Sequence, residues 1–425
     1  MFNLYLHHLF IITFITFLLN TNCNYFQTSN PIHFTNNKFI ALNYEKIYGI
    51  FQFYIRLGKP RQTFLISLNM STNITWISYY LYQKHKSSTI QILNDDTSFT
   101  LTNNTNDLKV PSLLISELIT IESIKEDNTY SLTPLSSSSY SIDKFMFYYP
   151  QINIPTEIGY DSIGSGFYYN NISFSLVHIF YQHNYISQIS FGFIPKSLFK
   201  GIIYFGKLPP NLKTVKHSYK HILPIVNPKL TEWNVQLKSI NYGKYPVDAN
   251  NHLIYFDSGE TYICVPFNFI QYLNKEYFST YIQERKCEYV ESEIEFSHYF
   301  YCKCKDINNF KSIVFNFGNK INIELTKNDL FEKDLTICYF VLRYCHIKNN
   351  NNTFVFGNSF FNLFPIEFNY ETKSIIIYNN IPFHKNTLND AKINPMYYYC
   401  YWMLCYLNIF GIIINIILII VNKVY

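Results

Sequence analysis

The sequence predicts an all-β fold, and two observations support that prediction. First, short segments rich in β-branched and aromatic residues recur along the chain, separated by Asn, Ser, Gly and Pro, which favour turns. Second, aromatic residues make up 19% of the 425 residues, and Tyr and Phe suit strand positions. The segments that predict strands are, in order, 41–58, 63–68, 75–82, 188–195, 201–209, 233–243, 312–318, 353–357 and 374–379. Helical spacing of apolar residues occurs at 173–187 and at 267–282.

An apolar run near the N-terminus predicts entry into the secretory pathway. Residues 9–19 have the length and composition of the apolar region of a signal peptide, which we expect to span residues 1–23. No Lys or Arg precedes the run, but it is short for a membrane span, so an uncleaved anchor is the weaker interpretation. We expect a short prosegment or linker at residues 24–40.

A second apolar run, at residues 397–421, predicts a transmembrane helix. It contains no charged residue and is long enough to cross a bilayer, with Tyr and Trp gathered at one end. A polar stalk at 381–396 precedes it, and a cytosolic tail at 422–425 follows it. We therefore expect a single-pass type I protein of a secretory-pathway or cell-surface membrane, with a luminal or extracellular ectodomain.

The cysteines predict disulfide bonds, since secreted chains meet an oxidising environment. Cys23 lies in the expected signal peptide, and Cys400 and Cys405 lie in the second apolar run. The remaining six are Cys264, Cys287, Cys302, Cys304, Cys338 and Cys345. The C-x-C spacing at Cys302 and Cys304 could indicate a metal site, but no matching His or Cys pair stands nearby, so we expect no metal.

Other partner classes leave no signal in the sequence. The formal net charge of +5 is spread along the chain without a basic block, so we expect no nucleic-acid partner. The sequence contains no phosphate-binding loop, zinc-binding helix motif or G-x-S-x-G. We expect no cofactor.

The motif with the most chemical content is Asp257-Ser258-Gly259. It follows the apolar run 253–256 and precedes further apolar residues. An apolar strand running into Asp-Ser-Gly resembles the active-site loop of pepsin-like aspartic proteases. The resemblance extends over residues 41–380, including a Gly-x-Pro-x-Gln-x-Phe turn at 58–64 and an apolar closing segment around Gly357.

This resemblance implies an all-β, bilobal pepsin-like acid protease fold with a C-terminal transmembrane helix, as in membrane-anchored relatives of plasmepsin or beta-secretase architecture. It implies an N-lobe at about 41–205 and a C-lobe at about 206–380, meeting near 190–208. It also implies that an extended peptide or protein ligand lies in the cleft between the lobes.

The family carries its catalytic loop twice, because two carboxylates must share one proton around an attacking water. The resemblance places Asn69 at the position of the first aspartate, Met70 at the usual Thr and Ser71 at the usual Gly. An amide cannot take the water's proton, and Met70 lacks the hydroxyl that normally locks the two loops together. These replacements predict that the first loop has lost its catalytic role.

The second loop is better preserved. Asp257 is the retained family aspartate, and Ser258, Gly259 and Gly357 match residues that support it. Glu260 stands where a small hydroxyl residue is usual, and its charge should raise the pKa of Asp257. The family's flap, expected at about 97–121, contains no Tyr-Gly here.

The resemblance also suggests pairings for the disulfides. Cys287 and Cys304 fall where the family's C-lobe disulfide commonly lies, so we expect Cys287 to pair with Cys304 or Cys302. We expect Cys338 to pair with Cys345 or Cys264. Glycosylation triplets begin at Asn69, Asn73, Asn103, Asn171 and Asn351, but in an Asn-rich chain such triplets also arise by chance.

Two functional hypotheses follow. The first is an aspartic endopeptidase homologue that has lost peptidase activity and binds a peptide or protein in its cleft. The second is an active aspartic endopeptidase that uses Asp257 with a compensating group. Loss of one member of a catalytic unit typically removes about 10⁴-fold of the rate, which favours the first hypothesis.

Overall fold

The computed structural model describes most of the chain between Lys38 and Tyr378, in one compact unit within residues 1–381. The described residues are 38–47, 50–70, 75–78, 82–102, 107–123, 138–151, 162–164, 175–197, 199–208, 220–226, 232–242, 245–249, 252–292, 297–345 and 353–378. The expected signal peptide (1–23), stalk (381–396), transmembrane segment (397–421) and tail (422–425) lie outside these ranges. Within them, no helix is long and apolar enough to cross a membrane.

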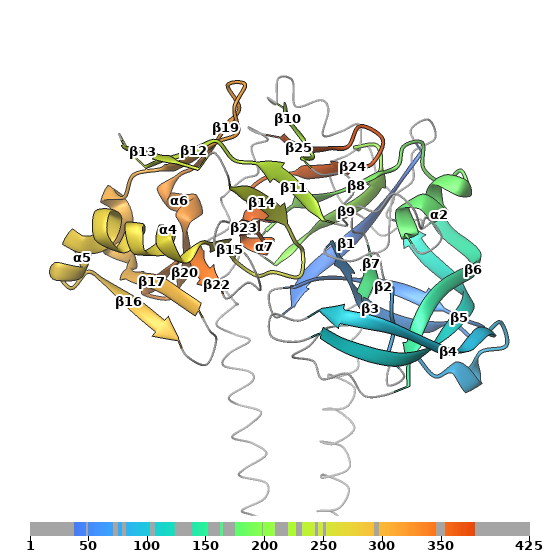
Figure 1. Cartoon of the computed structure of the whole chain (residues 1–425). Helices are drawn as coiled ribbons and strands as arrows, with labels where there is room; N and C mark the ends of the chain where they lie inside the picture. The colour runs from blue at the N-terminus through green and yellow to red at the C-terminus, as the bar shows by residue number, and fades with distance from the viewer. Residues whose placement is uncertain are drawn as a thin grey trace, which may run out of the picture. The chain divides into compact units, whose positions relative to one another are not determined.

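Strands dominate the described residues and form three sheets (Figure 1). The strands of the first half are β1 (Phe39–Ile47), β2 (Ile50–Leu57), β3 (Gln62–Asn69), β4 (Gln91–Thr102), β5 (Asp107–Ser123), β6 (Ser138–Pro150), β7 (Ser162–Gly164), β8 (Ser190–Pro195) and β9 (Lys200–Gly206). Those of the second half are β10 (Lys220–Pro224), β11 (Trp233–Gln236), β12 (Ser239–Tyr242), β13 (Tyr245–Asp248), β14 (Leu253–Phe256), β15 (Ile263–Val265), β16 (Cys287–Ser292), β17 (Ser297–Lys303), β18 (Ile313–Asn316), β19 (Asn322–Leu325), β20 (Phe331–Asp334), β21 (Ile337–Phe340), β22 (Leu342–Cys345), β23 (Thr353–Phe356), β24 (Ile366–Asn369) and β25 (Ser374–Tyr378). The predicted predominance of β-structure is confirmed.

The sheets connect strands that are distant in sequence. A 12-stranded sheet has the order β10-β25-β24-β8-β9-β1-β2-β3-β7, with β5 joined to β2 and flanked by β4 and β6. A 9-stranded sheet has the order β11-β14-β23-β15-β22-β17-β21-β20, with β16 on β17, and a 4-stranded sheet has the order β13-β12-β18-β19. The first strand, β1, begins at Phe39, inside the stretch expected to be a prosegment or linker.

The strands follow from the alternation of apolar residues. In β2, Phe51, Phe53, Ile55 and Leu57 point to one face of the sheet and are buried, while the residues between them are more exposed. The turn after β2 begins at Gly58, whose φ of 78° is a conformation that glycine adopts without strain. Antiparallel pairing of β2 with β3 then extends the core.

Both predicted helical segments contain helix. The first is α2 (Leu176–Gln182), and the second is α4 (Phe267–Tyr272), a π-helical stretch (Leu273–Phe278) and α5 (Ser279–Gln283). Short helices α6 (Lys327–Leu330) and α7 (Asn358–Phe361) complete the second half. In the π-helical stretch, Phe278 is fully buried and stacks on Phe300 of β17 at 3.9 Å between ring centroids. This ring contact fixes the helical segment on the 9-stranded sheet.

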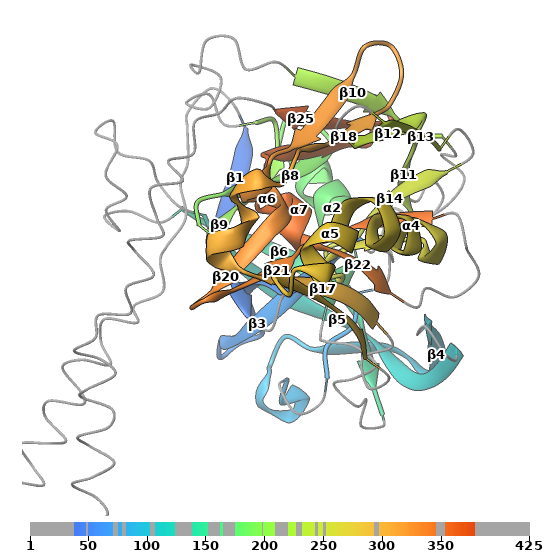
Figure 2. The same ribbon diagram turned by 90° about the vertical axis from the view of Figure 1, so that its left-hand side faces the viewer.

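The two halves meet at the β8–β9 hairpin, within the segment that the sequence predicts. Strand β8 pairs antiparallel with β24 of the second half, so one sheet is shared between the halves. Helix α7 packs against β8 (Figure 2). The rings of Phe193 in β8 and Phe361 in α7 stack at 5.2 Å, and those of Phe191 and Phe368 stack at 5.0 Å. Apolar burial therefore holds the halves together.

Residues 75–82 differ from the strand prediction. Among the described residues of this segment, Trp76 forms only an isolated bridge with Tyr148 of β6. Ile77 donates to the carbonyl of Tyr148, and Tyr148 donates to the carbonyl of Thr75. The aromatic residues are used for burial here, since Trp76 is 2% exposed.

Three disulfides lie in the second half: Cys264–Cys345, Cys287–Cys302 and Cys304–Cys338. One of the expected alternatives, Cys287 with Cys302, is present, but the expected pairing of Cys338 with Cys345 or Cys264 is wrong. Strand β17 lies between β16 and β21, so Cys302 faces Cys287 on one side and Cys338 on the other. Because Cys302 bonds to Cys287, Cys338 bonds to the nearby Cys304. Cys345 instead reaches Cys264, since β15 and β22 are parallel neighbours.

Candidate functional site

Asp257 lies directly after β14, where that strand leaves the core of the second half. Ile254 and Phe256 of the strand are buried, while the Asp257 side chain is half-buried. Strand β14 runs parallel to β23, and the backbone N–H of Asp257 donates to the carbonyl of Phe356 at 3.2 Å. The strand therefore ends by presenting a carboxylate at the margin of the core.

Asn69 occupies the matching position in the first half. It ends β3 and is half-buried between the buried residues Leu68 and Met70. Strand β3 runs parallel to β7, with Asn69 opposite Gly164. Strand β7 thus lies beside the end of β3, as β23 lies beside β14. Ser71 falls outside the described residues.

The two loops are joined directly. The Ser258 hydroxyl donates a hydrogen bond to the carbonyl oxygen of Leu68, and both residues are buried. Ser258 follows Asp257 and Leu68 precedes Asn69, so this bond brings the two sequence-predicted positions to one place. Met70 is fully buried and has no hydroxyl with which to make a reciprocal bond. The loops are therefore joined by the Ser258 hydroxyl but not by a hydroxyl at position 70.

Gly357 cradles the second loop at close range. Its N–H donates to the carbonyl of Tyr262 at 3.0 Å, and the N–H of Asn358 donates to the carbonyl of Glu260 at 2.8 Å. A Cβ at position 357 would lie 2.4 Å from both of these carbonyl oxygens, so only glycine fits. The Asn358 side-chain amide also donates to the carbonyl of Ser258 at 3.0 Å. This network fixes the loop that carries Asp257.

Hydrogen bonds within the loop orient its two carboxylates. The N–H of Gly259 donates to Oδ1 of Asp257 at 2.9 Å. Glu260 Oε1 accepts from the N–H of Thr261 at 2.8 Å and from that of Tyr262 at 3.2 Å. Burial raises the pKa of Glu260 to about 6, and the charge of Asp257 adds to the increase, against the backbone bonds and Arg343. Glu260 thus keeps its proton to a higher pH than an ordinary carboxyl group does.

Glu232 is a further carboxylate that the sequence analysis missed. Strand β11 pairs antiparallel with β14, with Trp233 opposite Phe256. Glu232 directly precedes β11 and Asp257 directly follows β14, so both residues lie at the same end of this strand pair. Burial raises the pKa of Glu232, and the charge of Asp257 raises it further. The sequence analysis predicted a strand at 233–243. If that strand had been paired antiparallel with residues 253–256, Glu232 would have been placed near Asp257. This pairing is the signal that could have identified Glu232.

The other side of the loop carries a buried cation. Arg343 of β22 is 7% exposed, and its guanidinium lies 3.5 Å from the ring centroid of Tyr262 and 4.6 Å from that of Tyr299. Ligating atoms of Glu260, Cys264 and Cys345 lie within 4.8 Å of one another. These cysteines form a disulfide, and metal ligation needs free thiolates, so the group does not fit a metal ion.

The β4–β5 hairpin spans the stretch in which the flap is expected. Its turn, at residues 103–106, lies outside the described residues. The buried carboxylate of Glu117 in β5 accepts hydrogen bonds from the hydroxyls of Tyr82 and Thr89, and from the N–H of Leu118 at 2.8 Å. This buried acid, which the sequence analysis did not single out, ties the base of the hairpin to the segment after Trp76.

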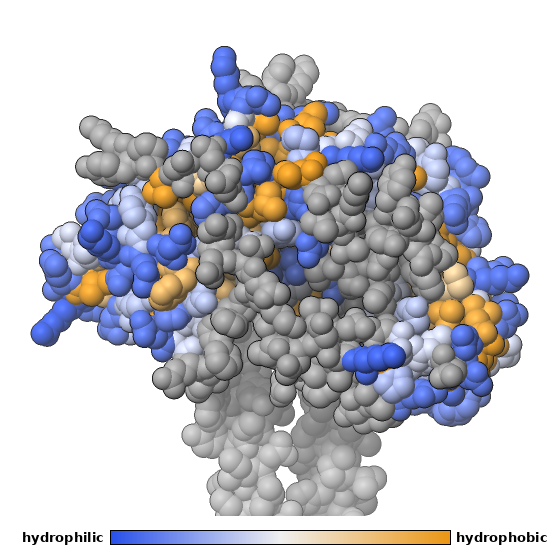
Figure 3. Space-filling view, viewed as in Figure 1, coloured by the Kyte–Doolittle hydropathy of each residue, from blue (hydrophilic) through white to orange (hydrophobic). Residues whose placement is uncertain are grey.

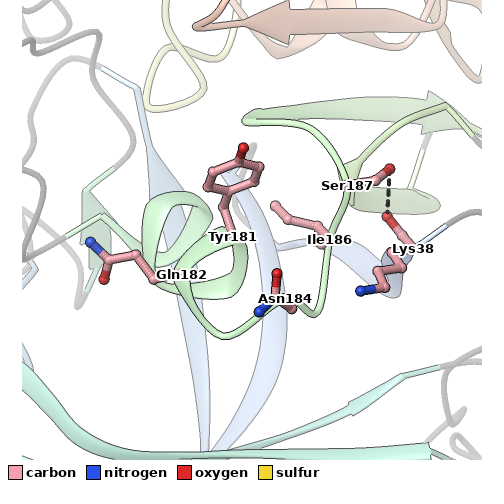
Figure 4. Close-up of a pocket in the computed structure, with 6 residues that line it drawn as sticks. All are labelled: Lys38, Tyr181, Gln182, Asn184, Ile186 and Ser187. Carbon is pink, nitrogen blue, oxygen red and sulfur yellow. Dashed lines mark hydrogen bonds between the residues drawn. The ribbon is translucent and has the colours of Figure 1, made fainter.

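A cavity of about 560 Å³ lies apart from these loops (Figure 4). Its lining residues are Lys38, Tyr181, Gln182, Asn184, Ile186 and Ser187. They come from the residue before β1, from the last turn of α2 and from the segment between α2 and β8, and they include none of the sequence-predicted site residues.

Exposed apolar side chains are also found away from the loops. Figure 3 shows apolar colour over β4, the strand that contains Ile92 and Leu93, which are 53% and 49% exposed. Their sequence neighbours Gln91 and Asn94 are polar and exposed. Ile92 and Leu93 therefore form a short apolar stretch with a polar residue on each side.

Comparisons with known proteins agree with this geometry. The family model described as eukaryotic aspartyl protease matches residues 54–379. No curated protein matches the sequence. Among solved structures, the chain is similar to basic 7S globulin from soybean, with 13% identity, a TM-score of 0.60, and coverage of 80% of this chain and 96% of that one. It is also similar to conglutin gamma, a basic 7S globulin from lupine seeds, with 14% identity, a TM-score of 0.62, and coverage of 81% and 96%.

The two globulins support the fold alone at this level of identity. The family match includes β3, β14, β23 and both loops, and it covers well over half of the chain. The chain therefore belongs to the eukaryotic aspartyl protease family.

Proposed function

We propose that this chain is a pepsin-like aspartic protease homologue that does not hydrolyse peptide bonds and instead binds an extended peptide or protein segment in the cleft between its halves. The observation that carries the proposal is the join of the two loops through Ser258 and Leu68. One loop offers Asp257, whereas the other offers Asn69 at the corresponding position. Peptide hydrolysis in this family needs two carboxyl groups that share a proton, and an amide cannot replace one.

The support of the second loop argues for retained binding. The N–H of Asp257 donates to the carbonyl of Phe356. Gly357 and Asn358 also donate hydrogen bonds to backbone carbonyls of the loop. Gly357 excludes every side chain, so the loop that carries Asp257 keeps the close packing on which its geometry depends. An extended peptide that adds main-chain hydrogen bonds is the ligand class suited to such a site.

We further propose that residues 397–421 anchor the protein in a secretory-pathway or cell-surface membrane. The three disulfides agree with maturation in an oxidising compartment. The ectodomain would then present its cleft to ligands in the lumen or outside the cell.

The alternative is an active aspartic endopeptidase that uses Asp257 with a compensating group. The specific observation in its favour is Glu232, a second carboxyl group whose pKa is raised by burial and then by the charge of Asp257. However, Glu232 comes from the same half as Asp257, while the family's mechanism places its two carboxyl groups on opposite sides of the attacking water.

The test exposes the purified full-length chain to a diverse peptide library from acidic to neutral pH. Immobilised protein is used to recover bound peptides, and mass spectrometry identifies both bound and cleaved species. We expect retained peptides without new termini. Hydrolysis that disappears in Asp257→Ala would establish the alternative, and neither binding nor hydrolysis would contradict both.

A further inference from the structure

We propose that four cysteines of the second half form a relay for thiol–disulfide exchange. A dithiol that enters at Cys304 leaves Cys302 bonded to Cys338, with Cys287 as a free thiol. The native bonds are Cys287–Cys302 and Cys304–Cys338. The exchange therefore moves a covalent link from β16 and β17 to β17 and β21. This inference concerns the fold of the second half and does not depend on the proposed binding function.

The strand register places Cys302 between two other cysteines. In β17, Cys302 is directly opposite Cys287 of β16 and also directly opposite Cys338 of β21. Both pairs of strands are antiparallel, and directly opposite residues of antiparallel strands have Cα atoms about 4.5–5.5 Å apart, with their side chains on the same face. A disulfide usually joins residues whose Cα atoms are about 4.4–6.8 Å apart. Cys302 can therefore bond to either neighbour without a change of register.

The four cysteines differ in their access to solvent. Cys287, Cys302 and Cys338 are buried, at 2%, 1% and 1% exposure. Cys304 is half-buried, because it begins the 3-10 helical turn (Cys304–Asn309) that follows β17. Exchange requires that the attacking thiolate reach a sulfur atom of the disulfide. A dithiol from solvent therefore meets the sulfur of Cys304 first.

The relay has three exchange steps. First, a thiolate of the dithiol attacks Sγ of Cys304, so a mixed disulfide forms and Cys338 leaves as a thiolate. Second, this thiolate attacks Sγ of Cys302, so the Cys302–Cys338 bond forms and Cys287 leaves as a thiolate. Third, the remaining thiol of the dithiol breaks the mixed disulfide and releases Cys304. The dithiol is oxidised to a disulfide, and the protein gains two electrons and two protons as the thiols of Cys287 and Cys304.

Burial should protect the product of the relay. The Cys302–Cys338 bond joins two buried residues, so a second dithiol molecule cannot reach either sulfur unless the sheet opens. The native Cys304–Cys338 bond lacks this protection, since Cys304 is half-buried. Under mild reduction, the form with Cys302 bonded to Cys338 should therefore accumulate.

The exchange changes how β16 is held. Among the described strands, β17 is the pairing partner of β16, through a register that runs from Cys287 opposite Cys302 to Ser292 opposite Ser297. The native Cys287–Cys302 bond adds a covalent link to this pairing. After the exchange, only the pairing of the two strands remains. We therefore expect β16 to open more often, while β17 and β21 stay linked.

The third disulfide provides an internal control. Cys264 is buried and Cys345 is half-buried, so a dithiol can enter at Cys345 as it does at Cys304. However, the residues opposite Cys264 are Arg343 in β22 and Val355 in β23. The register thus offers the released thiolate of Cys264 no second disulfide. Reduction here should leave thiols at both Cys264 and Cys345.

The experiment treats the folded full-length chain with increasing concentrations of dithiothreitol. Excess maleimide at mildly acidic pH then traps the free thiols, and peptide mapping locates the label and the remaining disulfides. We expect molecules that have lost one of the two native bonds to carry label at Cys287 and Cys304, with Cys302 linked to Cys338. Hydrogen exchange of the same molecules should be faster in β16 than in the untreated protein.

Three results would overturn the proposal. One is label at Cys304 and Cys338 with Cys287–Cys302 intact, which would show reduction without a relay. Another is label at Cys287 and Cys302 with Cys304–Cys338 intact, which would show entry at the buried pair. The third is resistance of both bonds to the dithiol while the protein stays folded.

A variant tests the second step without any reagent. Cys304→Ser leaves Cys338 without its native partner, so we expect Cys302–Cys338 to form and maleimide to label Cys287. Cys345→Ser is the matched control and should be labelled at Cys264, with the other two disulfides unchanged. Label at Cys338 in Cys304→Ser would contradict the second step. If either variant fails to fold, the mapping of the wild type still decides the proposal.

Discussion

The hydroxyl of Ser258 donates to the carbonyl oxygen of Leu68, and this single bond connects the halves of the molecule beside Asp257 and Asn69. The bond holds the end of β3 beside the end of β14, so the two loops stay in contact. In the function that we propose, the second acid is missing because residue 69 is Asn, and the buried Met70 supplies no hydroxyl.

Removal of this hydroxyl should weaken the join between the halves. In Ser258→Ala, the buried carbonyl of Leu68 loses a donor, and we expect a loss of about 1–3 kcal/mol in the free energy of unfolding. Urea denaturation of the two proteins measures the difference. Ser139→Ala, at an exposed position of β6, is the matched control and should have almost no effect. Equal losses in both variants would contradict a specific role for Ser258.

Two glycines of the site should respond very differently to substitution. Gly357→Ala places a Cβ 2.4 Å from the carbonyl oxygens of Glu260 and Tyr262, so the backbone must move, at a cost of about 3 kcal/mol or more. At Gly259 the nearest atom to an added Cβ is Oδ1 of Asp257, at 3.3 Å. Gly259→Ala should therefore be tolerated far better. Thermal unfolding of both variants checks the order, and comparable unfolding temperatures would refute the cradle described for Gly357.

Much of the architecture could be predicted because its determinants are local. The alternation in β2 and the apolar run before Asp257 specify strands directly. The pairing of Cys338 could not be predicted, because it depends on which neighbour Cys302 takes when β17 lies between two cysteine-bearing strands. Glu232 was missed for a similar reason, since the pairing of β11 with β14 brings it to the end of the strand that precedes Asp257.

The expected effect of Glu260 on the pKa of Asp257 stays a prediction, and the structure shows an effect in the opposite direction between the two residues. Glu260 was expected to act on Asp257, whereas the structure shows Asp257 contributing to a raised pKa at Glu260, after burial. Burial depends on the packing of the loop against β22 and β23, which no local pattern in the sequence expresses.

The raised pKa of Glu260 predicts a pH-dependent stability. Its folded-state pKa of about 6 exceeds the ordinary value of 4.5, so the folded protein binds this proton more tightly than the unfolded chain. The resulting stabilisation is complete below the ordinary value and is lost as the pH rises through about 6. Glu260→Gln mimics the protonated form and should exceed the wild type at neutral pH by about 1–2 kcal/mol, with little difference in acid.

Urea unfolding of both proteins at several pH values measures this difference. Glu324→Gln serves as the control for removal of an exposed acid and should follow the wild type. A constant gap between Glu260→Gln and the wild type at every pH would show that the effect does not come from titration of Glu260.

The disulfide connectivity can be checked directly. Mass mapping of the non-reduced protein should recover Cys264–Cys345, Cys287–Cys302 and Cys304–Cys338. Replacing both Cys264 and Cys345 by Ser removes a link across 81 residues and should cost about 2–5 kcal/mol, because the unfolded chain gains freedom. Recovery of Cys287 linked to Cys304 would contradict the arrangement of β16, β17 and β21.

The final prediction concerns the restoration of activity. Asn69→Asp returns the second acid to the end of β3, where Gly164 and the Ser258 bond already position the backbone. It does not return the hydroxyl lost at Met70 or the glycine lost at Ser71. We therefore expect Asn69→Asp alone to yield little hydrolysis, on the order of 100-fold or more below the triple variant Asn69→Asp/Met70→Thr/Ser71→Gly.

Hydrolysis of a peptide library and binding of a transition-state-analogue inhibitor of aspartic proteases measure the gain in activity of each variant. Adding Asp257→Ala to the triple variant should abolish it. Full activity in Asn69→Asp alone would show that the amide at position 69 is the sole defect, and that the lock through residue 70 is dispensable.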